Sequence, residues 1–232
     1  MRRVGSGAQL PAETELMKRY EASRPTLRFA LAQIENEGLL VRRQGLGNFV
    51  RHAPRLITYG AESGRPACRA DAAVEADANA ALRITVSRQN VRADDELAAL
   101  LELPTGSDLT EYFYKSRYAI DPCNVAWIYV PHAVAVLDVP VTSSSPTGED
   151  VQQALTAADI TIAETRTSIV SRLPNAEESR TLRIGAGTAV LGIEQIATDT
   201  TGRAVSLTRA VFPGYSAQAV FIEQVRELEA TR

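Results

Sequence analysis

Residues 10–50 read LPAETELMKRYEASRPTLRFALAQIENEGLLVRRQGLGNFV, and this run decides the fold of the N-terminal part. It starts with two short helical patterns separated by a tight turn. In the first, Leu16 and Tyr20 recur four residues apart behind acidic residues in the opening turn. The second begins at Ser23, a good N-cap residue, and ends at Gly38, where a left-handed residue is favoured. These features predict a helix-turn-helix.

A short hairpin is predicted directly after the second helix. Apolar residues 39–41 and 48–50 flank a basic, glycine-bearing tip with the sequence RRQGLG. Arg24, Thr26 and Arg28 lie near the start of the second helix, the end from which helix-turn-helix proteins reach bases and phosphates. Each part is common in proteins that bind no DNA. Their uninterrupted order nevertheless favours a winged helix-turn-helix.

This run resembles the DNA-binding domain of the GntR superfamily of bacterial transcription regulators. The resemblance implies that Arg24 and Arg28 contact DNA from the recognition helix, with Thr26 on the phosphates. One departure is Thr14, which stands where the family usually has an arginine, so a contact is expected to be missing or supplied from elsewhere. The resemblance also implies that Gln44, Gly45 and Gly47 form the wing tip at the minor groove. Arg42 and Arg43 of the wing are predicted to contact DNA as well, mainly through phosphates and minor-groove shape.

The segment before this run is short. Only MRRVGSGAQ precedes it, whereas proteins of this family usually carry a further helix there. We therefore expect a DNA-binding domain over residues 1–52 whose first helix is missing and whose apolar face is partly uncovered. Either the domain is naturally short, or the start given lies downstream of the true one. A regulator that binds protein through this front end and no DNA is one alternative.

Charge is distributed unevenly along the chain. The formal net charge is −3 over 232 residues. Residues 1–55 hold 10 Lys and Arg against 5 Asp and Glu, a net charge of +5, and the remainder holds 15 against 23, a net charge of −8. A DNA-binding protein neutralises phosphates locally, so the distribution is more informative than the sum. It indicates that the N-terminal part is the end that binds nucleic acid.

Length and composition suit a folded protein of one large or two modest domains. Apolar residues make up 45% of the sequence, yet no apolar run approaches the roughly 20 residues of a membrane span. Cys68 and Cys123 lack metal-binding spacing, and the two histidines, His52 and His132, are isolated, so no metal and no cofactor are expected. No signal peptide is recognisable, and the expected location is the reducing cytoplasm.

The rest of the chain is expected to form a linker and a second domain. Residues 53–80 are punctuated by Pro and Gly and then rich in Ala and acidic residues, which indicates a linker with a short strand at residues 56–59 and a loose helix. A plain surface connection is the favoured alternative. Over residues 81–232, strand patterns joined by hairpins alternate with helical patterns, including a short helix at residues 132–137 and an amphipathic tail at 220–229. This order predicts an α+β fold with an antiparallel sheet.

The second domain resembles the UTRA effector domain of the HutC branch of the GntR superfamily, whose fold is chorismate-lyase-like. The resemblance rests on LELPTGSDLTEYFYKSRYAIDPCNVAWIYVP at 101–131 and AVLGIEQIATDTTGRAVSLTRAVFPG at 189–214. Where the family has two glutamates and a tyrosine, this chain has Trp127, Ser206 and Phe212, which disfavours a sugar phosphate and favours a flatter, more apolar ligand. The effector-binding positions implied by the resemblance are Lys115, Arg117, Trp127, Ser206 and Phe212.

Lys115 and Arg117 lie two residues apart on a predicted strand and therefore face the same side. They could clamp a phosphate or carboxylate of the ligand. Two solvated strand cations are an equally weighted alternative.

The sequence thus predicts a cytoplasmic, homodimeric transcription regulator that binds a double-stranded DNA operator and a small-molecule effector, most often as a repressor. An enzyme of chorismate-lyase-like fold with an appended helical domain is the alternative from another class. It is disfavoured because the sequence offers no acid–base pair, no activated nucleophile and no P-loop.

Overall fold

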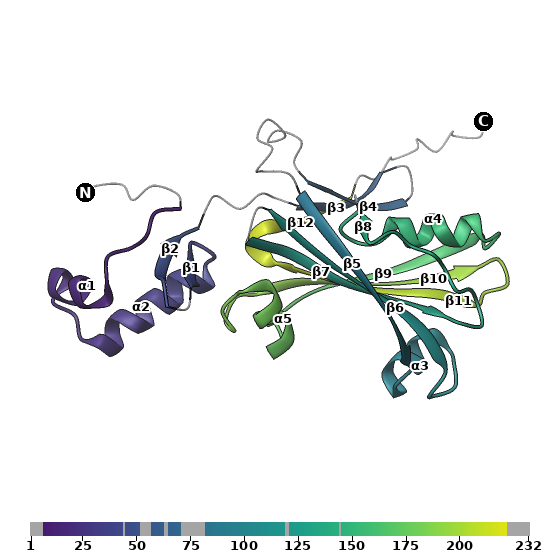
Figure 1. Cartoon of the computed structure of the whole chain (residues 1–232), viewed down its shortest axis with the longest axis horizontal. Helices are drawn as coiled ribbons and strands as arrows, with labels where there is room; N and C mark the ends of the chain where they lie inside the picture. Colours follow the sequence, from purple (N-terminus) through teal and green to yellow (C-terminus); the bar gives the residue numbers. More distant parts are fainter. Residues whose placement is uncertain are drawn as a thin grey trace, which may run out of the picture.

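The computed structural model describes residues 7–43, 45–51, 57–62, 65–70, 82–118, 121–143 and 145–221. A small N-terminal domain carries two helices and a hairpin, and a larger domain is built on a twisted antiparallel sheet (Figure 1).

The N-terminal domain begins with two helices, α1 (Glu13–Tyr20) and α2 (Arg24–Asn36). A left-handed residue at φ 48° follows α1 and turns the chain. The Ser23 hydroxyl then accepts a hydrogen bond of 3.3 Å from the Thr26 amide, which caps α2. Gly38 follows α2 at φ 75°, the left-handed conformation that favours glycine. The helix-turn-helix expected from the sequence is confirmed.

The wing is a two-stranded hairpin of β1 (Leu40–Arg43) and β2 (Gly47–Val50). Residues 7–10 run alongside β2, with a β-bridge between Gln9 and Phe49 and backbone hydrogen bonds on either side of it. The segment that precedes α1 therefore adds a third extended segment to the wing, which the sequence pattern did not reveal.

The packing of this domain is sparse. Its buried hydrophobic side chains, within residues 7–51, are Leu16, Leu27, Leu40 and Val41. The aromatic side chains of Tyr20 and Phe29 are 62% and 68% exposed, so part of the apolar surface of the two helices is uncovered. Few buried contacts hold α1 and α2 together.

The larger domain contains a seven-stranded antiparallel sheet in the order β8-β5-β6-β7-β11-β10-β9. Long hairpins join β6 to β7 and β10 to β11. The α+β class with an antiparallel sheet is confirmed. The strands are β5 (Leu82–Arg92), β6 (Asp108–Tyr118), β7 (Asp121–Pro131), β8 (Thr142–Ser143), β9 (Ile162–Arg172), β10 (Val190–Asp199) and β11 (Ala204–Pro213).

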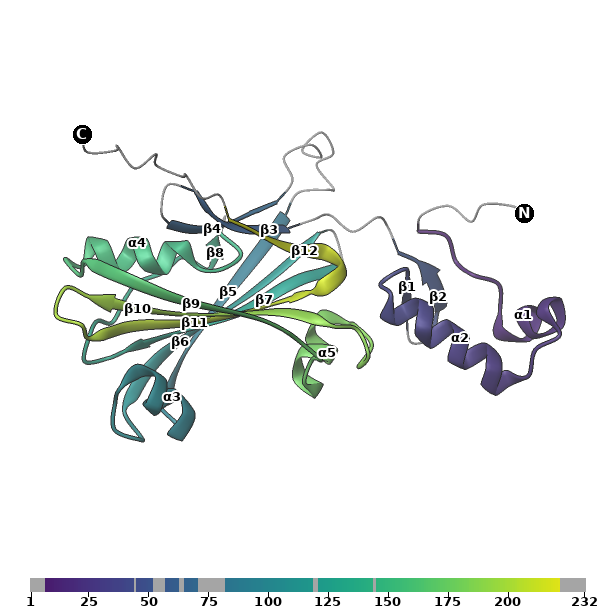
Figure 2. The ribbon, with the colours of Figure 1, turned by 180° about the vertical axis from the view of Figure 1, so that it is seen from behind.

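Helices cover both faces of this sheet (Figures 1 and 2). α4 (Glu149–Ala157) packs on one face, over the main core, in which Tyr112 and Tyr114 are fully buried. α3 (Asp95–Leu101) and α5 (Ala176–Leu182) lie on the other face, each above a smaller apolar cluster. Among the described residues, no helix lies over the middle of that second face, between α3 and α5.

A second, three-stranded sheet lies on the α4 side, formed by β12 (Ala217–Phe221), β3 (Ile57–Glu62) and β4 (Arg65–Ala70). A single 3-10 turn, η3 (Gly214–Ser216), leads from β11 into β12. Tyr59 is buried in the main core, and its hydroxyl accepts a hydrogen bond of 2.9 Å from Gln195.

The small sheet changes the expectation for residues 53–80. The short strand predicted there is present, but it packs into the second domain rather than forming a plain surface connection, because β3 finds a parallel partner in β12. The loose helix predicted next falls on residues 71–81, which lie outside the described residues. Most of the amphipathic tail predicted at 220–229 also lies outside them, because the description ends at residue 221.

The short helix predicted at residues 132–137 is wrong. This segment is a turn followed by chain without regular secondary structure. The backbone carbonyl of Leu137 accepts a hydrogen bond of 2.9 Å from the Tyr112 hydroxyl, so a buried side chain of the sheet, rather than a helical ladder, satisfies it.

Candidate functional site

The start of α2 presents the side chains predicted to contact DNA. Arg24, Thr26 and Arg28 are exposed, and the two arginines lie one helical turn apart on the same face. The Thr26 hydroxyl is 2.8 Å from that of Ser23, which fixes it at the cap. Arg28 donates from Nε to Glu13 Oε2 at 3.2 Å, yet its side chain stays 55% exposed. The pair with Glu13 on α1 holds Arg28 in place.

The two wing arginines differ in surroundings. Arg42 is exposed, whereas the Arg43 guanidinium lies 4.7 Å from the centre of the Phe49 ring and 4.0 Å from Asp121 of the larger domain. Neighbouring residues of a strand point to opposite sides, which accounts for the difference. The structure therefore separates two residues that the sequence analysis treated as equivalent.

The wing tip is open. Gly45 and Gly47 are exposed and adopt φ 75° and 105°, a region that side chains disfavour, and a Cβ on Gly45 would meet nothing within 4 Å. Gln44, also predicted to contact DNA, lies outside the described residues. Thr14, which replaces the usual arginine, is exposed on α1. The two glycines allow these tip conformations, and the Gln9 side chain lies against the same tip, where its Nε2 donates to the Leu46 carbonyl.

The N-terminal domain rests on the larger domain through the end of α2 and the wing. A Cβ on Gly38 would overlap the Tyr215 ring, and a Cβ on Gly187 would lie 2.5 Å from Asn36 Nδ2. The Arg51 guanidinium lies 4.7 Å from the centre of the same Tyr215 ring. The turn between α5 and β10 is therefore in close contact with the end of the recognition helix.

The residues predicted to bind an effector do not surround one cavity. Cross-strand pairing places Lys115, Arg117 and Trp127 on the face that carries α3 and α5. Ser206 and Phe212 are buried on the opposite face, and Phe212 belongs to the main core. The physical reason is strand parity: on β11 they alternate with residues that face the α3 and α5 side. Of the five, Trp127 alone lines the pocket described next.

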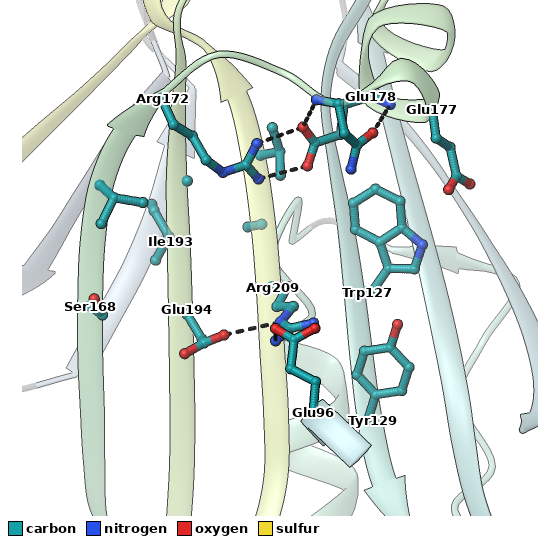
Figure 3. Close-up of a pocket in the computed structure, with 15 residues that line it drawn as sticks. Glu96, Trp127, Tyr129, Ser168, Arg172, Glu177, Glu178, Ile193, Glu194 and Arg209 are labelled. Carbon is teal, nitrogen blue, oxygen red and sulfur yellow. Dashed lines mark hydrogen bonds and ion pairs between the residues drawn. The ribbon is translucent and has the colours of Figure 1, made fainter. Parts of the chain in front are cut away.

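That pocket lies on the sheet between α3 and α5 and has a volume of about 560 Å³ (Figure 3). This is within the range of roughly 300–1,000 Å³ that is usual for small-molecule sites. Its floor is the central part of β10 and β11, where Gly192 contributes no side chain. Trp127 and Tyr129 form one wall. Trp127 packs against Phe113 with ring centres 5.2 Å apart.

Two ion-pair groups border the pocket (Figure 3). At the α5 end, Arg172 donates two hydrogen bonds of 2.7 Å to the two carboxylate oxygens of Glu178, whose side chain is 4% exposed. Glu178 also closes the capping box of α5 with Asn175. At the α3 end, Arg209 donates to Glu194 at 3.0 Å and to Glu96.

The charges at both ends are stabilised by these contacts. Burial alone would raise the pKa of Glu178, but hydrogen bonds from Arg172 and the Asn175 backbone, together with the Arg172 charge, lower it below its ordinary value. Burial would lower the pKa of Arg209, but hydrogen bonds from its guanidinium to Glu194 and Glu96 raise it. The shifts favour the charged forms of Arg172, Glu178 and Arg209.

The sequence analysis missed these pocket residues. The capping-box spacing from Asn175 to Glu178 is a local signal that could have indicated the start of α5. The partners Arg172, Arg209 and Glu194 carried no local signal, since they meet through strand register and through helices that follow different strands.

Comparison with known proteins identifies the family. The bacterial regulatory protein family gntR matches residues 2–50, and the UTRA domain family matches residues 82–218, more than half of the chain. The chain belongs to the GntR family of regulators and carries a UTRA domain. The resemblance stated from the sequence is thus confirmed. This family consists of transcription regulators rather than enzymes, so the regulator is favoured over the enzyme alternative.

Similar proteins agree with this GntR assignment. An HTH-type transcriptional regulator from Mycobacterium tuberculosis is 50% identical over 48 residues, 21% of this chain and 18% of the relative. An uncharacterised HTH-type transcriptional regulator from Streptomyces coelicolor is 24% identical over 221 residues, 90% of this chain and 82% of the relative. The crystal structure of PhnF from Mycobacterium smegmatis superposes with a TM-score of 0.58 and 18% identity, covering 97% of this chain and 94% of that one, which shows a shared fold.

None of the described helices is long and apolar enough to cross a membrane. Within the described ranges, no three His, Cys, Asp or Glu side chains are grouped so that they could hold a metal ion.

Proposed function

We propose that this regulator acts in the cytoplasm as a homodimeric repressor that binds operator DNA and releases it when a small molecule occupies the UTRA domain. The observation that carries the DNA-binding part is the exposed start of α2, where Arg24 and Arg28 share one face and Thr26 is fixed at the cap. Such a helix start reaches base edges in the major groove. The family resemblance supports the same residues.

Dimerisation follows from the size of the contact surface. One helix-turn-helix offers few base contacts, and two-fold pairing lets two copies read two half-sites about one helical turn apart. We therefore expect an inverted repeat as the operator. Sedimentation of the full chain, alone and with DNA, measures this directly: a complex with one protomer per operator contradicts the proposal.

A gel-shift titration tests the DNA surface. Replacing Arg24 with Ala should weaken binding to the operator by about 1–3 kcal/mol if the side chain contacts a base. The matched control is Arg92→Ala, which removes an exposed arginine from β5 in the larger domain and should leave the affinity unchanged. Equal effects of the two substitutions would show that only total charge matters.

We propose that α5 connects the ligand site to the DNA-binding domain. Its first turn carries Glu178 at the pocket, and the turn after it, through Gly187, contacts Asn36 at the end of α2. A shift of α5 on ligand binding would therefore change the position of the recognition helix. The ligand regulates only if it binds one of the two arrangements more tightly than the other.

A substitution that introduces a clash between the α5–β10 turn and α2, and a second substitution that removes the clash, test this connection. Gly187→Ala places a Cβ 2.5 Å from Asn36 Nδ2 without touching any arginine, so it should change operator affinity. Adding Asn36→Ala removes the clashing side chain and should restore it. If Gly187→Ala leaves the operator affinity unchanged, α5 does not connect the ligand site to the DNA-binding domain.

A further inference from the structure

The pocket between α3 and α5 carries surplus negative charge. Two arginines, Arg172 and Arg209, face four glutamates in its lining. Pairing accounts for Arg172 with Glu178, and for Arg209 with Glu194 and Glu96 together. The remaining carboxylate, Glu177, is exposed at the rim beside Trp127 (Figure 3). The lining therefore has a formal net charge of −2.

The arginines of this pocket are poorly placed to receive an anion. Both carboxylate oxygens of Glu178 are bound by Arg172, and Glu178 is almost fully buried. An incoming anion would have to displace it and leave a buried carboxylate without its partner, which is costly. Arg209 is likewise engaged by two carboxylates. A cation, in contrast, can bind near the carboxylates of the lining while the ion pairs of Arg172 and Arg209 stay intact.

The aromatic wall favours the same charge. The Trp127 side chain borders the pocket and is held from the side by Phe113, with ring planes inclined by 40°. Tyr129 continues this wall along β7 toward Glu96 (Figure 3). Indole and phenol faces attract organic cations through the ring quadrupole, most strongly where water is partly excluded. The floor at Gly192 and Val211 offers apolar surface to the body of such a ligand.

We propose that this pocket binds a small organic cation, an ammonium or guanidinium group on a compact flat or apolar body. Its charged group lies against Trp127 near the rim carboxylate Glu177, and its body lies over Gly192. This assigns a ligand class opposite in charge to the anion suggested by Lys115 and Arg117. The effect of the ligand on DNA rests on the proposed function, whereas its binding does not.

Three probes with one ring and different charge test the proposal on the full chain: benzylammonium, benzyl alcohol and benzoate. Calorimetric titration should show benzylammonium binding at least about ten-fold more tightly than benzyl alcohol. Benzoate should bind more weakly than either. Benzoate binding as tightly as benzylammonium, or no binding of the cation at millimolar concentration, overturns the proposal.

Variants locate the binding site. Glu177→Gln removes an exposed rim charge and should weaken benzylammonium several-fold, while Glu164→Gln, an exposed carboxylate on β9 outside the pocket, should not. Gly192→Leu fills the floor from a strand position without left-handed φ and should abolish binding, with circular dichroism confirming the fold. Retained binding in Gly192→Leu places the cation elsewhere and overturns the assignment.

A gel shift in the presence of benzylammonium separates the two proposals. Binding together with weakened operator affinity supports both. Binding with unchanged affinity supports the cation site and counts against the regulatory role proposed for the pocket.

Discussion

The two domains differ in how function relates to packing. In the N-terminal domain, a highly specific sequence run lies on a sparse core, and the residues expected to meet DNA are exposed. In the UTRA domain, the sequence resemblance is diffuse, while three apolar clusters and paired ions hold the sheet and its helices. The functional groups of the first domain are local in sequence, whereas those of the second meet only through strand register.

This difference follows from the ligands. DNA is a long, repetitive partner whose phosphates and groove edges are met by an exposed helix end and a hairpin, so one short run suffices. A small molecule must be enclosed, and a pocket needs walls from several elements. The DNA-binding residues therefore lie on the surface, whereas the residues of a small-molecule pocket must be held in place by the elements packed around them.

The largest expected effect is the loss of folding stability when a leucine is removed from the core of each domain. Leu182→Ala, at the fully buried last residue of α5, should destabilise the UTRA domain by about 2–5 kcal/mol. Leu27→Ala, in the sparse core of the first domain, should cost less, near the lower end of that range at about 2 kcal/mol, because fewer neighbours lose contact. Urea unfolding followed by the fluorescence of the single tryptophan, Trp127, and by circular dichroism separates the domains. A larger loss for Leu27→Ala contradicts the comparison.

A smaller effect concerns pH and the UTRA domain alone. The lowered pKa of Glu178 means that its contribution is present above the ordinary carboxyl pKa and is lost as pH falls through the folded-state value. Because Arg172 is 41% exposed and screened, we expect Glu178→Gln to cost about 1–2 kcal/mol at neutral pH. Thermal melts at decreasing pH should show wild type and variant converging in acid. If the stability difference between wild type and Glu178→Gln did not change with pH, the ion pair with Arg172 would not be its cause.

The wing arginines test whether exposure decides DNA contact. Arg42→Ala should lower the slope of log affinity against log salt by about 1, since one phosphate contact is lost. Arg43→Ala should change the slope less, because Arg43 lies on Phe49 and near Asp121. Fluorescence anisotropy with random DNA at several salt concentrations measures both. Equal slopes for the two variants would show that Arg43 leaves these partners on binding.

The smallest expected effect is that of the pair between the two helices. Glu13→Ala frees Arg28 and should change stability by only about 0.2–1 kcal/mol, as is usual for exposed pairs. Its effect on operator affinity should exceed its effect on stability if Glu13 orients Arg28. Thermal melts and gel shifts on the same preparation compare the two quantities.

Much of the fold could be predicted from local patterns. The Ser23 cap, the Gly38 stop and the wing were recognisable because each is set by residues a few positions apart. The short helix at 132–137 failed because a tertiary hydrogen bond from Tyr112 holds that backbone. β12 was missed because its partner β3 lies far away in the sequence.

The effector site shows the same limit. The sequence placed Trp127, Ser206 and Phe212 in one site by resemblance, but strand parity puts Trp127 on one face of the sheet and the other two on the opposite face. A one-residue change in register moves a side chain through the sheet, and sequence spacing near a turn does not determine it.

The sequence by itself determined the family, the helix-turn-helix with its wing, the order of most strands and the positive front of the chain, because each depends on neighbouring residues or on composition. Only the tertiary structure decided which wing arginine is exposed, which face holds the pocket, and that Arg172 and Arg209 are occupied by glutamates. Those properties depend on distances between segments that are remote in sequence. Strand pairing and helix packing set these distances, and no local pattern encodes them.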